Sequence, residues 1–423
     1  MELTFSPVSR LRGRLRVPGD KSISHRAALV GALATGVTTI DGFLEADDTA
    51  RTVACLRALG VRIEGEPTRL RVHGAPLHAP AAPLDAGNSG TTMRLLAGIL
   101  AGHPFRSELT GDASLRARPM DRIIEPLRQM GAEISALGEG RYPPLRIRGG
   151  PLHSIAYTLP VASAQVKSAI LFAALFADGT TTITEPVPTR DHTERMLAGF
   201  GAAISHQGSS IRLRAGALRA QHVRVPGDLS AAAFVLAAAA ARPGSDVTVE
   251  GVGVNPTRTG ILDVLRSMGA EVEVLDDASS ADEPIGTITV RGRPLHGVTI
   301  GGAMIPRLID ELPVLCVIAT AAEGTTIITD AAELRVKESD RIGTIARGIR
   351  ALGGQVEERP DGLVVHSGRL AGGRVDSTGD HRVAMAFAVA GLLARSPVTV
   401  EGAEAMSISF PEFPRAVATV AAQ

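Results

Sequence analysis

Lysine is the residue that this sequence lacks most clearly. Only three of its 44 basic residues are lysine, at positions Lys21, Lys167 and Lys337, and the others are arginine. A solvated surface accepts either residue, whereas a site that needs a compact charge with a movable proton requires lysine. Chance retention is the alternative for any one of them. Because all three lie in polar segments, we expect them to mark functional positions.

Aromatic residues and net charge are also scarce. The chain has no tryptophan, two tyrosines and ten phenylalanines, and its 44 basic residues balance 44 acidic ones. Without a positive field or aromatic platforms for stacking, we expect no nucleic-acid partner. The two cysteines, Cys55 and Cys316, lie far apart in apolar stretches. Their placement indicates small buried residues in a reducing compartment.

Long apolar runs and several common motifs are missing as well. The longest runs, such as residues 231–241, are too short to span a bilayer, and the N-terminus has no apolar signal core. No Cys/His spacing resembles a zinc site, and GxxxxGK[ST], GxGxxG and GxSxG are absent. The sequence therefore predicts a soluble, cytoplasmic protein with no membrane partner, no metal, and no nucleotide-hydrolase or Rossmann chemistry.

An internal repeat organises the chain. The segment Pro18-Gly19-Asp20-Lys21-Ser22 returns 208 residues later, at 226 against 18, as Pro226-Gly227-Asp228-Leu229-Ser230. Each copy follows a short strand pattern and precedes an alanine-rich helix. The offset is about half the chain, which indicates a duplication.

A shorter unit recurs within each half, and each unit has one helix apolar on nearly all faces and one amphipathic helix. We expect the apolar helices, which are typical of buried ones, at residues 22–34, 91–101, 164–177, 229–241, 309–322 and 381–394. Five amphipathic helices should end at left-handed caps on Gly60, Gly131, Gly201, Gly269 and Gly353. A sixth, near residues 411–420, could take its strand from the N-terminus. The pattern predicts an α/β protein with three units in each of two domains, one formed by residues 1–16 plus 226–423 and the other by residues 17–225.

Polar residues gather where the expected buried helices begin. These starts are residues 20–26, 88–94, 163–165, 309–311 and 379–382. A helix N-terminus offers unpaired N–H groups and a partial positive charge, which favour anions. Ordinary capping is the alternative for any single start. If the buried helices run parallel, their starts converge on one face of each half, and we expect a cleft between the domains for a multiply anionic ligand.

At this point the motifs resemble a known family, that of 5-enolpyruvylshikimate-3-phosphate synthase, or 3-phosphoshikimate 1-carboxyvinyltransferase. The matching segments span the chain: residues 18–26, 87–94, 118–120, 163–165, 309–311, 335–341 and 380–382. The resemblance implies a two-domain inside-out α/β barrel with three βαβαββ units per domain. It also implies transfer of the enolpyruvyl group of phosphoenolpyruvate to the 5-hydroxyl of shikimate 3-phosphate, on the route to chorismate and aromatic amino acids. A monomer without cofactors is expected.

The resemblance also implies roles for individual residues. Shikimate 3-phosphate would be bound by Lys21, Ser22, Arg26, Ser163, Ala164, Gln165, Arg190, Asp310 and Lys337. Phosphoenolpyruvate would be bound by Lys21, Gly90, Arg118, Gln165, Arg341 and Arg382. Asp310 would accept the proton of the 5-hydroxyl, and Lys21 or Glu338 would protonate C3 of phosphoenolpyruvate. Gly90 resembles the glycine of glyphosate-sensitive members, so inhibition by glyphosate is expected.

One departure from the family pattern and two rivals stay open. Some relatives carry a lysine before a Phe-Pro or Tyr-Pro pair, whereas this chain has Ile408 in the segment before Phe410-Pro411. A basic contact to phosphoenolpyruvate would then be absent or supplied elsewhere. The first rival is transfer of enolpyruvate to UDP-N-acetylglucosamine, whose enzymes typically carry a cysteine in the loop at residues 111–118. The second is a non-catalytic anion-binding protein on the same fold.

Overall fold

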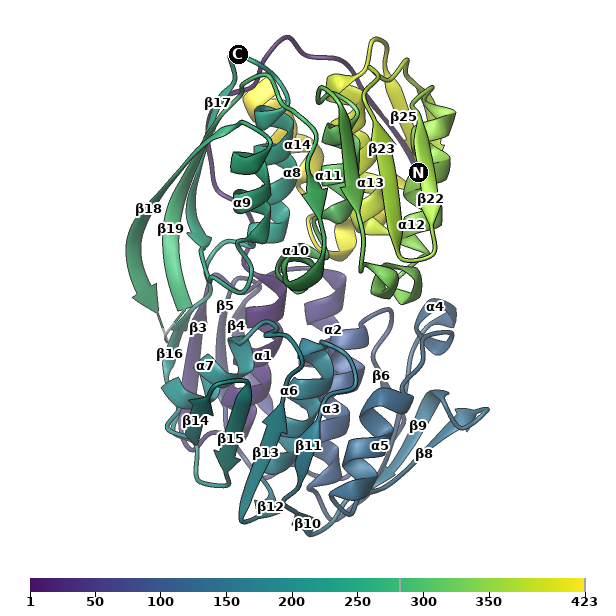
Figure 1. The fold of residues 1–423 in the computed structure, drawn as a ribbon. Coiled ribbons are helices and arrows are strands. Elements are labelled where there is room, and N and C mark those ends of the chain that lie inside the picture. Colours follow the sequence, from purple (N-terminus) through teal and green to yellow (C-terminus); the bar gives the residue numbers. More distant parts are fainter. Residues whose placement is uncertain (281–282, 422–423) are drawn as a thin grey trace. The chain divides into compact units, whose positions relative to one another are not determined.

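The computed structural model describes residues 1–280 and 283–421, and these divide into two compact units (Figure 1). Unit 1 comprises Met1–Pro18, Pro226–Ala278 and Pro284–Gln423, and unit 2 comprises Gly19–Val225 with the short segment Ser279–Glu283. Each unit has its own hydrophobic cluster of buried side chains. We describe each unit by itself.

Unit 2 contains three four-stranded sheets that share one plan. In each sheet the first two strands are parallel and the remaining neighbours are antiparallel. The orders are β16(His222–Arg224)-β3(Val37–Asp41)-β5(Arg69–His73)-β4(Arg62–Glu66), β6(Leu84–Asp85)-β7(Arg106–Thr110)-β9(Tyr142–Arg148)-β8(Glu133–Gly138), and β11(Ala156–Thr158)-β13(Thr180–Thr184)-β15(Ser210–Arg214)-β14(Ala203–Gln207). Along β5, Leu70 and Val72 are buried while Arg69 and Arg71 are exposed, the alternation expected of a sheet with one covered face.

Three nearly apolar helices form the centre of unit 2. They are α1 (Lys21–Leu33), α3 (Gly90–Ala101) and α6 (Ala164–Ala174), and the amphipathic α2 (Asp47–Ala58), α5 (Asp121–Gln129) and α7 (His192–Gly199) accompany them. A Cβ added to Gly98 would lie 2.1 Å from the carbonyl oxygen of Ala169, so α3 and α6 touch backbone to backbone. Small residues allow this close approach, which explains a core built with few aromatic rings.

Unit 1 repeats the plan with one difference. Its sheets are β18(Glu271–Ser280)-β19(Glu283–Arg291)-β17(Asp246–Gly253)-β2(Arg12–Leu15), β20(Thr299–Ile300)-β21(Thr325–Ile328)-β23(Gly362–His366)-β22(Val356–Arg359), and a three-stranded β1(Glu2–Phe5)-β25(Val398–Glu401)-β24(Gly373–Asp376). The N-terminal strand β1 pairs antiparallel with β25, which confirms that the last unit takes a strand from the N-terminus. The helices are α8 (Leu229–Ala240), α9 (Gly260–Ser267), α10 (Ile305–Leu308), α11 (Leu312–Ala319), α12 (Arg341–Ala351), α13 (His381–Leu393) and α14 (Phe413–Ala421) (Figure 1).

The five closing glycines are confirmed, and one predicted helix begins later than expected. The glycines adopt positive φ between 82° and 105°, as a left-handed cap requires. The buried helix expected at residues 309–322 is present as α11, but it begins at Leu312, after a turn that follows the end of α10 at Leu308. Pro313 lacks an N–H and clashes with the preceding turn, so it fits only the first turn of a new helix. Asp310 and Glu311 consequently lie in the turn before α11.

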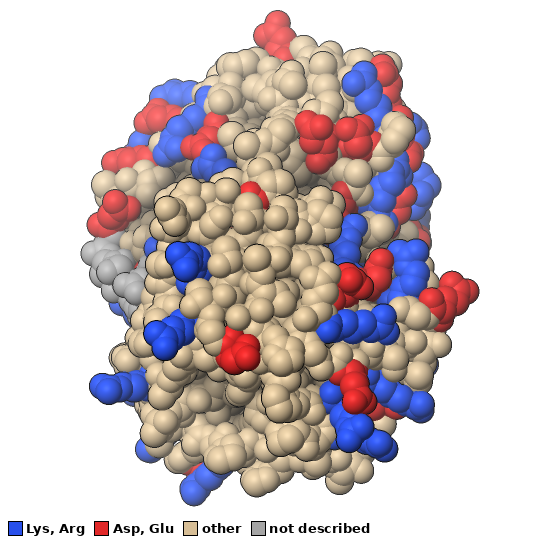
Figure 2. Space-filling view, turned by 60° about the horizontal axis from the view of Figure 1, so that its bottom comes forward, with Lys and Arg blue, Asp and Glu red and all other residues tan. Residues whose placement is uncertain are grey.

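Charge and hydropathy at the surface agree with the balanced composition. On the face shown in Figure 2, side chains of both signs lie interspersed among uncharged residues. None of the helices in residues 1–280 and 283–421 combines the length and apolar character needed to cross a membrane.

Candidate active site

The start of α1 in unit 2 carries the first group of predicted residues. The side chain of Asp20 caps the helix by accepting a hydrogen bond from the backbone N–H of Ile23 (2.9 Å). Lys21 is the first helical residue, and its Nζ lies 3.0 Å from Oδ2 of Asp48. The Lys21 side chain retains 13% of its exposure, so solvent or a ligand can still reach it. A partly exposed ammonium group therefore lies at a helix N-terminus, and the ammonium group and the helix N-terminus each favour binding of an anion.

Arg26 ties α1 to two other helices. It donates from Nε to the Thr193 hydroxyl (2.6 Å), from Nη1 to the Ser22 carbonyl (2.9 Å) and from Nη2 to the Ser168 hydroxyl (2.8 Å). Burial lowers the pKa of Arg26 to about 10, partly offset by Glu194. The guanidinium is thus held in one position and stays charged at neutral pH.

The starts of α3 and α6 are joined by hydrogen bonds. Gln165 donates from Nε2 to the Thr91 hydroxyl (3.0 Å) and accepts at Oε1 from Nη1 of Arg94 (2.8 Å). Ser163 caps α6 by accepting from the Val166 N–H (3.4 Å), and Ala164 is the first residue of the helix. Since Arg26 also bonds to α6, the N-termini of α1, α3 and α6 lie together in unit 2.

Gly90 and Arg118 lie at the edge of this group. Arg118 is 7% exposed and donates to the Asn88 carbonyl (3.2 Å), the Asn88 side-chain oxygen (2.7 Å) and the Ser114 hydroxyl (3.1 Å). A Cβ on Gly90 would lie 2.6 Å from Nη1 of Arg94 and 3.5 Å from Nη1 of Arg118. A side chain at position 90 would therefore press on the guanidinium of Arg94 and lie in ordinary contact with that of Arg118.

Arg94 is the residue that the motif-based assignment of roles left out. Its guanidinium reaches Gln165, the Pro119 carbonyl (3.4 Å) and the space beside Gly90. The sequence signal was present, since Arg94 belongs to the polar start at residues 88–94. What the sequence did not contain was its bond to a residue 71 positions away.

In unit 1, Arg341 gathers three carboxylates. Its Nη1 lies 3.1 Å from Asp310, Nη2 lies 2.6 Å from Glu338, and Nε lies 2.8 Å from Asp380. The Arg341 side chain is 1% exposed, whereas Asp310 and Glu338 keep 15% and 21%. Burial alone would lower the pKa of Arg341, but the three carboxylates outweigh burial and raise it. Arg341 therefore remains a permanent cation. The candidate base and one candidate acid therefore share one buried arginine.

Lys337 and Arg382 complete the predicted residues of unit 1. Burial lowers the pKa of Lys337, and Asp310 and Glu338 oppose that shift. Arg382 is 5% exposed at the start of α13, where Asp380 caps the helix by accepting from the Arg382 N–H (2.9 Å). The starts of α11, α12 and α13 thus lie together. The start of α8 joins them, because Ser230 donates to the carboxylate of Glu311.

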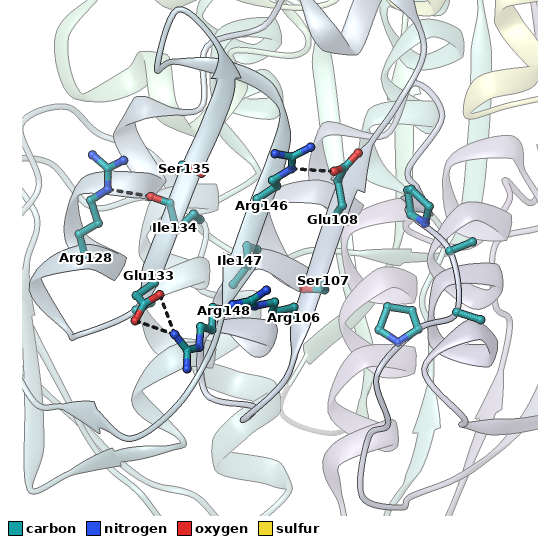
Figure 3. Close-up of a pocket in the computed structure, with 15 residues that line it drawn as sticks. Arg106, Ser107, Glu108, Arg128, Glu133, Ile134, Ser135, Arg146, Ile147 and Arg148 are labelled. Carbon is teal, nitrogen blue, oxygen red and sulfur yellow. Dashed lines mark hydrogen bonds and ion pairs between the residues drawn. The ribbon is translucent and has the colours of Figure 1, made fainter.

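A groove of about 890 Å³ lies elsewhere in unit 2 (Figure 3). It follows the outer face of β7, β9 and β8 beside the loop at residues 80–83, and its lining comes entirely from residues 80–148. Arg146 pairs with Glu108 (3.1 Å) and Arg148 with Glu133 (3.5 Å) across this face. Its charges are those of a solvated sheet surface, and the predicted site residues lie outside its lining.

No group of three or more His, Cys, Asp or Glu side chains that could hold a metal ion occurs in the described part of the chain.

Comparison with solved structures identifies the fold. EPSP synthase from Acinetobacter baumannii is 45% identical to this chain with a TM-score of 0.88, covering 99% of this chain and 98% of that one. The enolpyruvyl transferase NikO from Streptomyces tendae superposes with a TM-score of 0.79 at 18% identity, over 99% and 97% of the two chains, and so bears on the fold alone.

Comparison of sequences identifies the family. The profile described as EPSP synthase (3-phosphoshikimate 1-carboxyvinyltransferase) matches residues 5–417. Relatives named 3-phosphoshikimate 1-carboxyvinyltransferase include one from Acidithiobacillus ferrooxidans, 56% identical over 96% of this chain and 95% of the relative. Another, from Desulforamulus reducens, is 51% identical over 98% of both chains. This chain belongs to the EPSP synthase family, which confirms the resemblance, the transferase class and the inside-out α/β fold.

Proposed function

We propose that this protein transfers the enolpyruvyl group of phosphoenolpyruvate to the 5-hydroxyl of shikimate 3-phosphate and releases phosphate. Family membership supports the reaction. The observation that carries the assignment to these residues is the Arg341 cluster, which joins Asp310 and Glu338 to one buried cation. Groups that exchange protons with a substrate must be held in place yet reachable, and both carboxylates are partly exposed.

We assign shikimate 3-phosphate to the helix starts of unit 2 together with two residues of unit 1. The residues are Lys21, Ser22, Arg26, Ser163, Ala164, Gln165 and Arg190 from unit 2, and Asp310 and Lys337 from unit 1. In unit 2, the joined N-termini of α1 and α6 support a phosphate site, because their N–H groups and Arg26 all favour an anion.

We assign phosphoenolpyruvate to a second set. It comprises Lys21, Gly90, Arg118 and Gln165 from unit 2, and Arg341 and Arg382 from unit 1. The absence of a side chain at Gly90 supports this, because a Cβ there would displace the guanidinium of Arg94 and occupy space next to Arg118. Planar guanidinium groups bind carboxylate and phosphate in a two-point fashion, as phosphoenolpyruvate requires.

The charge balance of unit 1 indicates why residues of unit 2 are needed. Arg341, Lys337 and Arg382 carry three positive charges against the three carboxylates of Asp310, Glu338 and Asp380, so the charges of these six residues balance. Two anionic substrates must therefore find part of their positive counter-charge elsewhere. We assign that role to Lys21, Arg26 and Arg118, whose fixed charges oppose repulsion between the substrates.

The mechanism consists of an addition followed by an elimination. Asp310 takes the proton of the 5-hydroxyl while the oxygen of that hydroxyl forms a bond to C2 of phosphoenolpyruvate. The electrons of the C2–C3 double bond take a proton from Lys21 or Glu338, which gives a tetrahedral adduct. The C3 proton then returns to the protein, the double bond reforms, and the C2–O bond to phosphate breaks. The departing phosphate takes the proton that Asp310 had accepted, which restores the carboxylate. Asp310 must be ionised at the start, and Arg341 favours that state.

Asp310→Asn tests the assignment most directly. It keeps the shape of the side chain and removes the base, so we expect phosphate release to fall by about 10²–10⁴ in kcat. The assay supplies phosphoenolpyruvate with shikimate 3-phosphate, and in parallel with UDP-N-acetylglucosamine. Glu412→Gln, which neutralises an exposed carboxylate of unit 1, is the matched control and should retain full activity.

The outcomes separate the rivals. Phosphate release that depends on shikimate 3-phosphate and is lost only in Asp310→Asn supports the proposal. Release with the sugar nucleotide alone would overturn the acceptor while keeping the chemistry. Release with neither acceptor would favour an anion-binding protein.

We also propose that the enzyme works as a monomer in the cytoplasm. The state of the two cysteines supports a reducing compartment: Cys55 and Cys316 are free and buried, and burial raises the pKa of each thiol to about 12. Sedimentation at assay concentration, with and without both substrates, tests the monomer.

A further inference from the structure

Lys167 on α6 is the one lysine to which the proposed reaction gives no role, and it is completely buried. Its Nζ lies 2.7 Å from Oε1 of Glu194 on α7 and 3.0 Å from Oε2 of Glu185, which follows β13. The same nitrogen lies 3.4 Å from the carbonyl oxygen of Thr189. One ammonium group thus joins a helix, a strand end and a loop.

The position is unusual for a residue that only fills space. An apolar side chain of similar volume commonly stabilises a core as well as or better than a buried ion pair, because charges are costly to remove from water. Here three charged groups, Lys167, Glu185 and Glu194, are each 7% exposed or less. Such a cluster suggests that the placement of neighbouring groups, rather than core stability, is what the charges provide.

The first of those neighbours is the loop that carries Arg190. Thr189 is held at two points: its carbonyl by Lys167, and its hydroxyl by a hydrogen bond to Oε1 of Glu185. Arg190 is the next residue, so clamping both groups of Thr189 limits the directions that the Arg190 side chain can take. Arg190 lies in the electrostatic field of Arg26, which places both guanidinium groups in one region of unit 2.

The second neighbour is Arg26 itself. It bonds to the hydroxyls of Ser168, the residue after Lys167, and Thr193, the residue before Glu194. Those two hydroxyls also bond to each other (2.7 Å). Glu194 stands closest to Lys167 and attracts Arg26 as well, so the two cations share one buried carboxylate.

We propose that Lys167 is a positioning residue for the shikimate phosphate: with Glu185 and Glu194 it fixes the Thr189 loop and α7, and thereby sets the spacing of Arg190 and Arg26. It does not touch either substrate. The proposal rests on the proposed function, because it concerns the phosphate group of that acceptor. It predicts a defect confined to one substrate.

The test is Lys167→Met, which keeps the length of the side chain and removes its charge. We expect the dissociation constant for shikimate 3-phosphate, measured by calorimetry, to rise about tenfold. The KM for phosphoenolpyruvate at saturating acceptor should stay within about twofold, and so should kcat. Urea unfolding first establishes that the variant is folded.

Ile170→Ala is the matched control. Ile170 is fully buried on the same helix and has no part in the cluster, so its truncation loosens α6 without touching the charges. It should lower the midpoint of unfolding and leave the affinity for shikimate 3-phosphate within about twofold. An equal rise in both variants would overturn the proposal in favour of general loosening.

A double-mutant cycle locates the effect. If Lys167 acts through Arg190, then Lys167→Met should weaken binding in the Arg190→Ala background by no more than about threefold. Full additivity would overturn that route. If Lys167→Met does not fold, Thr189→Val replaces it, since it removes only the hydroxyl bond to Glu185. That variant should raise the same dissociation constant about threefold, and unchanged binding would overturn the proposal.

Failure of the proposed function gives a different pattern. If the unaltered protein releases no phosphate with shikimate 3-phosphate, calorimetry with inorganic phosphate replaces the acceptor. Weaker phosphate binding in Lys167→Met, but not in Ile170→Ala, then supports the positioning role by itself. Equal phosphate binding in all three proteins overturns it.

Discussion

The two Pro-Gly-Asp turns, at α1 and at α8, are copies of one segment but differ in the side chains that surround them. Both run into an alanine-rich helix, and in both the aspartate caps that helix: Asp20 accepts from Ile23 and Asp228 accepts from the Ser230 N–H (2.8 Å). Both helices therefore begin at an aspartate cap, although the capped N–H lies three residues on at α1 and two residues on at α8. The side chains beyond the cap differ at almost every position.

At α1 the turn presents polar side chains that are partly exposed. At α8 the corresponding space is occupied by charged side chains of the protein itself. Lys21 keeps 13% of its exposure, but its counterpart Leu229 keeps 1%. Ser22 is partly exposed, while Ser230 is fully buried between Arg258 and Glu311. One turn remains available to an external anion. The other has an internal arginine and carboxylate in the corresponding place.

The comparison teaches that the motif alone does not make an anion site. A capped helix start supplies N–H groups and a partial charge in both copies. What distinguishes them is whether a neighbouring element covers the start with charges of its own. Duplication can thus preserve the same capped turn in both halves while leaving an anion site at only one of the two copies.

The largest expected effect comes from making α1 resemble α8. Lys21→Leu installs the residue found at the corresponding position 229, so the turn should still form. We expect kcat/KM to fall by about 10²–10⁴, because a proposed proton donor and a phosphate contact are lost together. Steady-state kinetics with both substrates measure it. Retention of activity within tenfold would show that Lys21 is only a partner of Asp48.

The second-largest expected effect concerns the turn before α8, where Arg258 and Glu311 lie against Ser230. Arg258→Met leaves Glu311, which is 1% exposed, without its buried cation, so the free energy of unfolding should fall by about 3–5 kcal/mol. Denaturation in urea measures the loss. Adding Glu311→Gln should recover part of it, because one uncompensated charge is then gone while the buried Asp228, 3.5 Å from Arg258 in the parent, keeps its own. Equal stability of the single and double variants would mean that charge balance is irrelevant at α8.

The smallest expected effect is a difference in pH dependence. Burial, helped by Lys21 and Arg26, lowers the pKa of His25, where α8 has Ala233. The unfolded chain therefore binds a proton near pH 6.5 that the folded chain refuses, so stability falls as the pH drops below that value. The slope from His25 should approach about 1.4 kcal/mol per pH unit.

Unfolding of the parent and of His25→Ala between pH 5 and pH 8 checks this slope. The variant loses the contact between His25 and Thr52 (2.7 Å) and should be less stable throughout. Its curve should nevertheless be flatter below pH 6.5. Parallel curves for the two proteins would contradict the assignment.

Periodicity predicted most of the fold, and the failures have local causes. The repeated helix–glycine–strand pattern placed five left-handed caps correctly, because a positive φ leaves a strong preference for glycine. The buried helix expected at 309–322 is present, but it begins only at Leu312, because Pro313 suits the first turn of a helix. That shift matters, since Asp310 then lies in the turn before the helix.

The polar helix starts could be predicted from the sequence, but the contacts that hold them together could not. The Arg94–Gln165 bond and the Lys167 cluster join positions far apart in the chain, and local patterns carry no information about such pairs. The scarcity of lysine in the sequence drew attention to Lys167 but did not indicate its contacts or its role. The catalytic and binding roles of Asp310, Glu338 and the other motif residues stay predictions that the variants above test.

The pairing of β1 with β25 sets an order of events during synthesis. Glu2 lies opposite Glu401, so β1 leaves the ribosome about 20–80 s before its partner β25 at ordinary translation rates. All the strands of unit 2's three sheets lie within Gly19–Val225 and emerge in the interval. The sheets of unit 2 can thus be complete before most of unit 1 has been synthesised, and the nascent chain then carries one set of finished sheets and an unpaired strand β1.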